Sequence, residues 1–169
     1  QRMAYIPDEL FYFMQADTME MKRFYEGIYP QFDSKLFYKM QEFFPTIDVK
    51  RTIRRLSKGM QKQVAFWLAI CCKPDLLILD EPVDGLDPVM RRQIWSILMA
   101  EVAERKMTVL VSSHNLRELE DTCDHVGIMH HGKIMIERSL SDLQGNISKI
   151  QVACQNGVPK LPDDFEVLH

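Results

Sequence analysis

Four consecutive apolar residues, 76–79, narrow the possible folds of this chain more than any other segment, because Asp80 and Glu81 follow them directly. A continuous apolar run of this length is typical of a parallel strand that is buried on both faces. A second such run covers residues 108–111, and a helical pattern that begins at Asp87-Pro88 lies between the two. Aspartate is a good helix cap and proline suits the first helical position. The strand–helix–strand order therefore predicts a crossover in a parallel sheet, and hence an α/β fold.

The part of the chain before this strand has a helical pattern that is rich in aromatic residues. A short strand at residues 3–6 is predicted to end at Pro7, which cannot continue a hydrogen-bonded ladder. Two helices are predicted over about residues 19–25 and 35–44, because glycine or proline stop signals follow each of them. Ser57 is a good cap for a third helix. Its apolar face would consist of Met60, Val64, Trp67, Leu68 and Cys71.

Two local signals follow the second apolar run. Asn115 with Glu118 indicates the cap of a short helix. Two apolar stretches, residues 126–129 and 134–136, flank His131-Gly132 and predict a β-hairpin.

Composition argues against several classes of function. The chain has 169 residues, 46% apolar and 27% charged, so it can build one domain with a core and is not predicted to be disordered. A formal net charge of −3 gives no basic field for nucleic acid or for an anionic membrane. The four cysteines show no CxxC pair and no metal-ligand spacing, which indicates reduced thiols in a reducing compartment. The longest apolar run, residues 64–72, is too short to cross a bilayer, and the chain begins with no signal-peptide pattern.

Asp80 and Glu81 are the first candidates for chemistry. A buried parallel strand that ends in two carboxylates presents them at the carboxyl edge of the sheet, where ligands bind in open α/β folds. One carboxylate can hold Mg²⁺, usually through water, and the next can orient an attacking water or take its proton. A solvated acidic turn explains the same residues equally well, so both interpretations stay open at this point.

Three other segments carry weaker signals. Ser57-Lys58-Gly59-Met60 begins a helix, where free N–H groups and the positive end of the helix dipole favour a phosphate. Taken alone, an ordinary capped helix is the simpler interpretation. Residues 84–87 form a turn and a cap. His114 follows the second strand and could donate to a phosphate, although such a histidine is more often a satisfied polar residue.

The order and spacing of these segments resemble those of the ATP-binding domains of the ABC superfamily. Residues 56–60 resemble the ABC signature, residues 76–81 resemble Walker B, residues 84–87 resemble the D-loop, and His114 resembles the switch histidine. The predicted hairpin is also similar to the stretch that these domains carry after the switch. The resemblance spans about residues 3–143, which is nearly the whole chain.

This resemblance implies a role for each matching residue. Asp80 would hold Mg²⁺ through water, Glu81 would be the catalytic base or would orient the water, and His114 would contact the γ-phosphate of ATP. The signature residues Ser57, Lys58, Gly59 and Met60 would bind the ATP of a partner subunit, with Ser57 and the Gly59 backbone at its γ-phosphate. Asp87 would communicate across that dimer.

Three departures from the family pattern qualify these roles. Lys58 and Met60 stand where the commonest signature has Gly and Gln, a variant that is similar to ATPase subunits of bacterial multidrug or peptide exporters. Asp8 stands where the Q-loop usually has glutamine; it could reach Mg²⁺ directly or through water, but it adds a negative charge. No phosphate-binding loop (Walker A, GxxxxGKS or GxxxxGKT) occurs in the chain. Without that loop, the 169 residues alone are predicted neither to bind ATP tightly nor to hydrolyse it.

The resemblance implies an α/β fold of the P-loop NTPase (RecA-like) type, with a parallel-sheet core, an inserted helical subdomain and a truncated N-terminus. Residues 1–7 would form the end of a core strand and the start of the Q-loop. Residues 8–73 would form the helical subdomain with the signature helix, residues 74–145 the ATPase core, and residues 146–169 a C-terminal tail.

The implied function is the ATP-hydrolysing subunit of an ABC transporter, with an exporter favoured. ATP and Mg²⁺ would be its cofactors, enclosed by a head-to-tail homo- or heterodimer of ATPase domains. A transmembrane permease subunit would hold the chain on the cytoplasmic face of the cell membrane; no nucleic-acid partner and no transmembrane segment of its own are expected. Two alternatives stay open. One is a non-transport ABC ATPase in DNA repair or on ribosomes, although no long heptad pattern or second cassette is present. The other is a non-catalytic interaction module.

Three weaker patterns favour structural roles. His130-His131 is more typical of a hairpin turn than of a metal site. The basic run that leads into the signature indicates a solvated helical face more than a nucleic-acid site: Lys50, Arg51, Arg54, Arg55 and Lys58. Aromatic residues are expected to pack the helical subdomain, and some of them to contact the membrane subunit: Phe11, Tyr12, Phe13, Phe24 and Tyr25.

Overall fold

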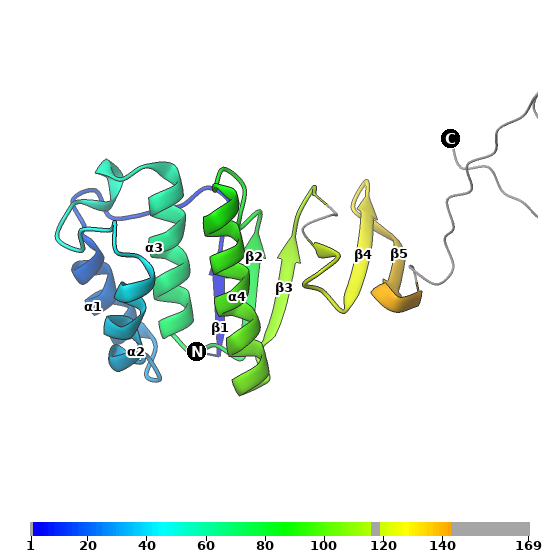
Figure 1. The fold of residues 1–169 in the computed structure, drawn as a ribbon, viewed down its shortest axis with the longest axis horizontal. Helices are drawn as coiled ribbons and strands as arrows, with labels where there is room; N and C mark the ends of the chain where they lie inside the picture. The colour runs from blue at the N-terminus through cyan, green and yellow to red at the C-terminus, as the bar shows by residue number, and fades with distance from the viewer. Residues whose placement is uncertain (1, 116–118, 143–169) are drawn as a thin grey trace, which may run out of the picture. The chain divides into compact units, whose positions relative to one another are not determined.

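The computed structural model describes residues 2–115 and 119–142, and the chain divides into two compact units, Gln1–Thr122 and Cys123–His169 (Figure 1). The first unit holds a parallel sheet in the order β1-β2-β3, formed by β1 (Met3–Ile6), β2 (Leu76–Asp80) and β3 (Thr108–Ser112). Strands β1 and β2 are neighbours although about seventy residues separate them in sequence. The predicted α/β fold with a parallel sheet is confirmed.

The residues between β1 and β2 form a helical insertion. It consists of α1 (Thr18–Ile28), α2 (Ser34–Met40), two short 3₁₀ helices (Gln41–Phe43 and Ile53–Arg55) and α3 (Lys58–Cys71). A fourth helix, α4 (Pro88–Arg105), connects β2 to β3. The crossover helix lies where the sequence predicts it, whereas residues 8–73 as a separate subdomain stay a prediction.

Two helix ends differ from the prediction. Helix α1 continues to Ile28 and so includes Gly27, which a last helical turn tolerates at a modest energetic cost. The predicted helix over 35–44 is in fact split, because α2 ends at Met40 and a 3₁₀ turn follows. The N–H of Gln41 bonds to the carbonyl oxygens of Tyr38 and Lys39, which tightens the backbone there.

Side-chain caps fix the starts of α3 and α4. The Ser57 hydroxyl accepts a hydrogen bond from the N–H of Met60 at 3.2 Å. The Asp87 carboxylate accepts from the N–H groups of Val89 and Met90, and Pro88 occupies the first turn. Both predicted caps are confirmed, and they fix where the segments on either side of β2 enter their helices.

The core of the helical insertion forms around Trp67 of α3. Its indole ring stacks on the Phe37 ring, with the ring centroids 4.5 Å apart. The centroid of the Phe44 ring lies 5.8 Å from that of Trp67. All three side chains are buried. Four of the five residues predicted for the apolar face of this helix are buried, and Met60 is half-buried.

The prediction that both apolar strands are buried on two faces is wrong. In β2, Leu77 and Leu79 are fully buried, but the residues that alternate with them are only half-buried. In β3, Leu110 is 60% exposed. Leu77 and Leu79 join a core that Ile94 and Leu98 of α4 also enter. Within the described residues, no comparable set of side chains covers the opposite face of the sheet. Successive residues of each apolar run therefore alternate between more buried and more exposed positions.

The expected packing of the aromatic residues holds only in part. Tyr12 is buried and its hydroxyl donates to the Gln61 carbonyl oxygen at 2.6 Å. Phe11, Phe13 and Phe24 are 77%, 47% and 43% exposed, so they are not part of the buried core, and the expected contact of some aromatic residues with a membrane subunit stays a prediction. The rings of Phe13 and Phe24 contact each other edge to face, with centroids 5.0 Å apart. An exposed aromatic surface therefore accompanies the buried core.

The second unit contains the predicted hairpin, formed by β4 (His125–His130) and β5 (Lys133–Ser139) in antiparallel pairing. His131 and Gly132 have φ values of 48° and 73°, as a tight hairpin turn requires. The units divide after Thr122, inside the stretch 74–145 that the sequence assigns to one core, and those domain boundaries stay a prediction. Glu118 and the tail 146–169 lie outside the described residues. No described helix is long and apolar enough to span a membrane.

Candidate functional site

The carboxyl ends of β2 and β3 bring Asp80 and Ser112 together. The two residues are partners in the parallel register. The Ser112 hydroxyl donates to Asp80 Oδ1 at 2.5 Å and accepts from the N–H of Glu81 at 3.3 Å. The N–H of Glu81 also lies 3.2 Å from the Ser112 carbonyl oxygen. One serine thus orients both acidic residues, and sequence reasoning missed it; its signal was its place at the end of the second apolar run.

Glu81 has a backbone conformation that few residues with a side chain adopt. Its φ is 44°, in the left-handed region. The N–H of Asp84 donates to its carbonyl oxygen at 3.3 Å, which closes a turn directly after the strand. Strained backbone of this kind persists only where surrounding contacts hold it, and it is frequent at functional sites. The turn directs the Glu81 carboxylate toward the end of β3.

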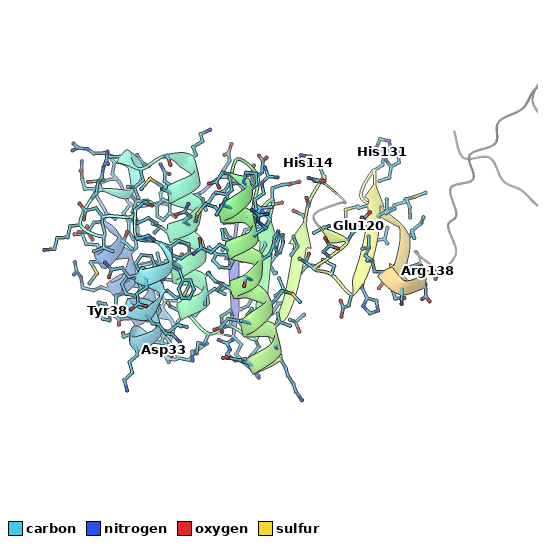
Figure 2. All side chains as sticks on the ribbon, in the orientation of Figure 1. Asp33, Tyr38, His114, Glu120, His131 and Arg138 are labelled. Atoms are coloured by element: carbon cyan, nitrogen blue, oxygen red, sulfur yellow. The ribbon has the colours of Figure 1, made fainter. Side chains whose placement is uncertain are left out.

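His114 meets that carboxylate through two contacts. Its backbone N–H donates to Glu81 Oε1 at 3.0 Å, and its Nδ1 lies 3.0 Å from Glu81 Oε2. Figure 2 shows His114 just beyond the end of β3. The histidine side chain is 74% exposed, whereas that of Glu81 is 26% exposed. Glu81 and His114, which the sequence singled out separately, are therefore neighbours, with the carboxylate held in place and the imidazole largely exposed.

A small polar pocket of about 80 Å³ lies beside this pair. Its lining residues are Glu81, Asp84, Arg91, Ser113, His114 and Asn115. The Arg91 Nε–H donates to the Leu86 carbonyl oxygen at 2.9 Å, so the guanidinium is held beside the loop 84–87. Two carboxylates, an imidazole and a guanidinium around one opening can bind a water molecule and an anionic group together.

The segment that resembles the signature lies against the loop that resembles the D-loop. A side chain at Gly59 would place its Cβ 3.3 Å from Leu86 Cδ2 and 3.8 Å from the Gly85 carbonyl oxygen. A larger residue at position 59 would therefore have to displace the Leu86 side chain by a few tenths of an ångström, so Gly59 favours the close packing of this segment on the loop 84–87. Lys58 is exposed, whereas Met60 is half-buried against the core. The ATP-binding roles of Ser57, Lys58, Gly59, Met60 and Asp87 stay predictions.

Asp8 is engaged with a residue that sequence reasoning did not single out. Asp8 Oδ1 lies 3.0 Å from Nζ of Lys62, which stands in α3. The same ammonium donates to the Glu81 carbonyl oxygen at 2.9 Å. Three segments that are distant in sequence meet at this lysine, and its position on the helix gave no signal by itself.

Asp80 can hold Mg²⁺ only if water and phosphate oxygens supply the remaining ligands. Asp80 supplies a hard carboxylate oxygen, and Ser112 orients it through the other oxygen's hydrogen bond. In the part of the chain that the structure describes, no group of three or more His, Cys, Asp or Glu side chains could hold a metal ion by itself. A single carboxylate with water and phosphate oxygens is the usual way in which proteins bind Mg²⁺.

Comparison with known proteins decides the family. The family model described as "AAA domain, putative AbiEii toxin, Type IV TA system" matches residues 10–120. The chain belongs to this AAA domain family. The relatives and the solved structure that it matches are ATP-binding proteins of ABC transporters, and the chain is similar to them in sequence and fold.

Two relatives and one structure illustrate the likeness. The ABC transporter ATP-binding protein YtrB of Bacillus subtilis (strain 168) is 29% identical over 158 residues, which cover 94% of this chain and 54% of YtrB. The bacitracin transport ATP-binding protein BcrA of Bacillus licheniformis is 34% identical over 125 residues, covering 72% of this chain and 41% of BcrA. A solved ATP-binding subunit of an ABC transporter superposes with a TM-score of 0.75 at 26% identity, covering 85% of this chain and 61% of that structure.

The ABC-type fold predicted from the sequence is thereby confirmed. The chain spans roughly half the length of the curated relatives it matches.

Proposed function

We propose that this chain supplies the hydrolytic edge of an ABC-type ATPase that powers a transporter, with an exporter favoured. The contact between Glu81 and His114 carries the proposal, because two hydrogen-bond-length contacts hold the carboxylate beside an exposed imidazole. Glu81 would orient the attacking water and accept its proton, and His114 would donate to the γ-phosphate.

Asp80 would hold Mg²⁺ through water, oriented by Ser112. Bound Mg²⁺ would neutralise charge on the phosphates during their transfer. Ser57, Lys58, Gly59 and Met60 would meet the ATP of a second ATPase domain in a head-to-tail homo- or heterodimer, and Asp87 would communicate across it. The chain contains no Walker A loop, so we expect these 169 residues alone to be inactive and the complete protein to be active.

A transmembrane permease would be the other partner, and it would hold the ATPase at the cytoplasmic face of the membrane. The exposed side chains of Phe11, Phe13 and Met14, and of Phe24 in α1, whose ring contacts Phe13, support a contact of this kind, since large exposed apolar side chains that lie together are typical of a docking surface. The exporter direction is supported by the signature variant with Lys58 and Met60.

The substitution Glu81→Gln in the complete protein tests the proposal. It keeps the size of the side chain and its contact with the His114 N–H but removes the base. We expect turnover of ATP to fall by at least 100-fold, a typical contribution of general-base catalysis. The matched control is Glu104→Gln, the same change at an exposed position of α4, which should leave turnover unaltered. Equal turnover in Glu81→Gln and the unmodified protein would refute the assigned role.

A further inference from the structure

Lys62 connects three parts of the chain that are far apart in sequence. It stands in the second turn of α3, and its side chain is only 12% exposed. Its ammonium lies 3.0 Å from Asp8 Oδ1, just after β1, and 2.9 Å from the carbonyl oxygen of Glu81, just after β2. An ammonium carries three donors. Two of them are directed at oxygens whose positions matter for the proposed site.

The contact with Glu81 bears on the backbone that aims its carboxylate. Glu81 has a φ of 44°, and its carbonyl oxygen accepts from both the Asp84 N–H and the Lys62 ammonium. A residue with a side chain keeps such a conformation only while its neighbours fix it. A charged donor forms a stronger hydrogen bond than a neutral one. The ammonium therefore helps to hold the peptide group from which the Glu81 side chain projects.

The contact with Asp8 gives that residue a function other than metal binding. Sequence alone allows Asp8 to reach Mg²⁺, yet one of its oxygens is paired with Lys62 in the structure. The pair offsets the negative charge that stands where the family usually has glutamine. Asp8 also restrains the lysine, because a long side chain with two fixed partners has little freedom left.

We propose that Lys62 is a positioning residue of the site: it holds the Glu81 peptide in its left-handed conformation, and Asp8 holds Lys62. This inference rests on the proposed function, since it acts through Glu81. A purely structural tie between α3 and the sheet is the competing explanation. A tie of that kind would alter the stability of the protein without a selective effect on the rate of the chemical step.

The test uses the complete protein and compares Lys62→Met, Lys62→Arg and Asp8→Asn. Methionine keeps the length of the side chain but donates nothing. We expect Lys62→Met to lower kcat by about 10- to 100-fold, since a small misplacement of a catalytic group costs rates of that order. KM for Mg-ATP should stay within about twofold, because substrate contacts are not removed. Lys62→Arg should restore most of the rate, and Asp8→Asn, which leaves the contact with Glu81 intact, should lose less than Lys62→Met.

Two controls sharpen the result. Lys39→Met makes the same change at an exposed position of α2 and should leave kcat and the melting temperature unaltered. In a Glu81→Gln background, Lys62→Met should lower turnover no further, because both changes act on the same group. The inference would be overturned if the two substitutions together lowered turnover by the product of their separate effects. It would also be overturned if Lys62→Met lowered the melting temperature and left kcat unchanged. If Glu81→Gln itself fails to lower turnover, the proposed function fails first and the role of Lys62 with it.

Discussion

Replacing Trp67 by phenylalanine should destabilise the chain by about 2–4 kcal/mol. Trp67 is fully buried in α3, and its Nε1–H donates to the Phe37 carbonyl oxygen at 2.9 Å. That oxygen lies in the last turn of α2, where the N–H of Gln41 bonds to the Tyr38 and Lys39 carbonyl oxygens. The side chain thus supplies a buried hydrogen bond to the last turn of α2.

The magnitude has two parts. A buried acceptor that loses its donor costs about 1–3 kcal/mol. The smaller ring also leaves a cavity of roughly 40 Å³, which costs about 1 kcal/mol at the measured dependence on cavity volume. The phenyl ring retains part of the stacking on Phe37, so no further loss is assigned to it. The two free-energy costs add, because the same substitution removes both the N–H donor and the ring atoms that filled the cavity.

Urea unfolding followed by far-ultraviolet circular dichroism measures this change. For a slope of about 2 kcal/mol per molar, the midpoint should fall by about 1–2 M with the slope unchanged. The matched control is Trp95→Phe in α4, where the tryptophan is only half-buried and the loss should be under about 1 kcal/mol. Equal midpoint shifts in the two variants would show that the indole donor and the buried position of Trp67 contribute nothing special.

Two further predictions concern the site and the effect of pH. Ser112→Ala in the complete protein should raise the Mg²⁺ concentration for half-maximal turnover about tenfold, because Asp80 loses the donor that orients it. The control is Ser96→Ala at an exposed position of α4. An unchanged Mg²⁺ concentration for half-maximal turnover in Ser112→Ala would contradict this role. Burial raises the pKa of the Cys72 thiol and of the Tyr25 hydroxyl to about 12 each. Above about pH 9 the unfolded chain releases these protons before the folded chain does, so the stability that these two groups contribute should be level up to that pH and then fall toward pH 12. A melting temperature that rises between pH 9 and 10.5 would refute this account.

The sequence predicted those parts of the fold that depend on local patterns. Ser57 and Asp87 cap their helices as expected, because a cap depends only on residues within one turn. The order of strands and helices follows from apolar periodicity, which is also local. The split of the helix at Met40 was not predictable from local sequence. It accompanies a hydrogen bond from Trp67 to the Phe37 carbonyl oxygen, and these two residues are 30 positions apart.

Burial and long-range contacts were harder to predict from the sequence than helices and caps. Leu110 belongs to an apolar run and yet is 60% exposed, because burial depends on what covers a strand and not on the strand itself. Asp8 and Lys62 are separated by 54 positions, and only the parallel pairing of β1 with β2 brings Asp8 to α3 and Glu81. Ser112 was missed for a similar reason, since its bond to Asp80 follows from the register of two strands.

The nucleotide that remains bound after incubation with Mg-ATP tests the central claim most directly. The complete protein and its Glu81→Gln variant would be incubated with Mg-ATP, separated rapidly from free nucleotide, and analysed for bound ATP and ADP. A base at Glu81 predicts that the variant retains intact ATP while the unmodified protein holds ADP. ADP formed by the variant at the unmodified rate would contradict the account.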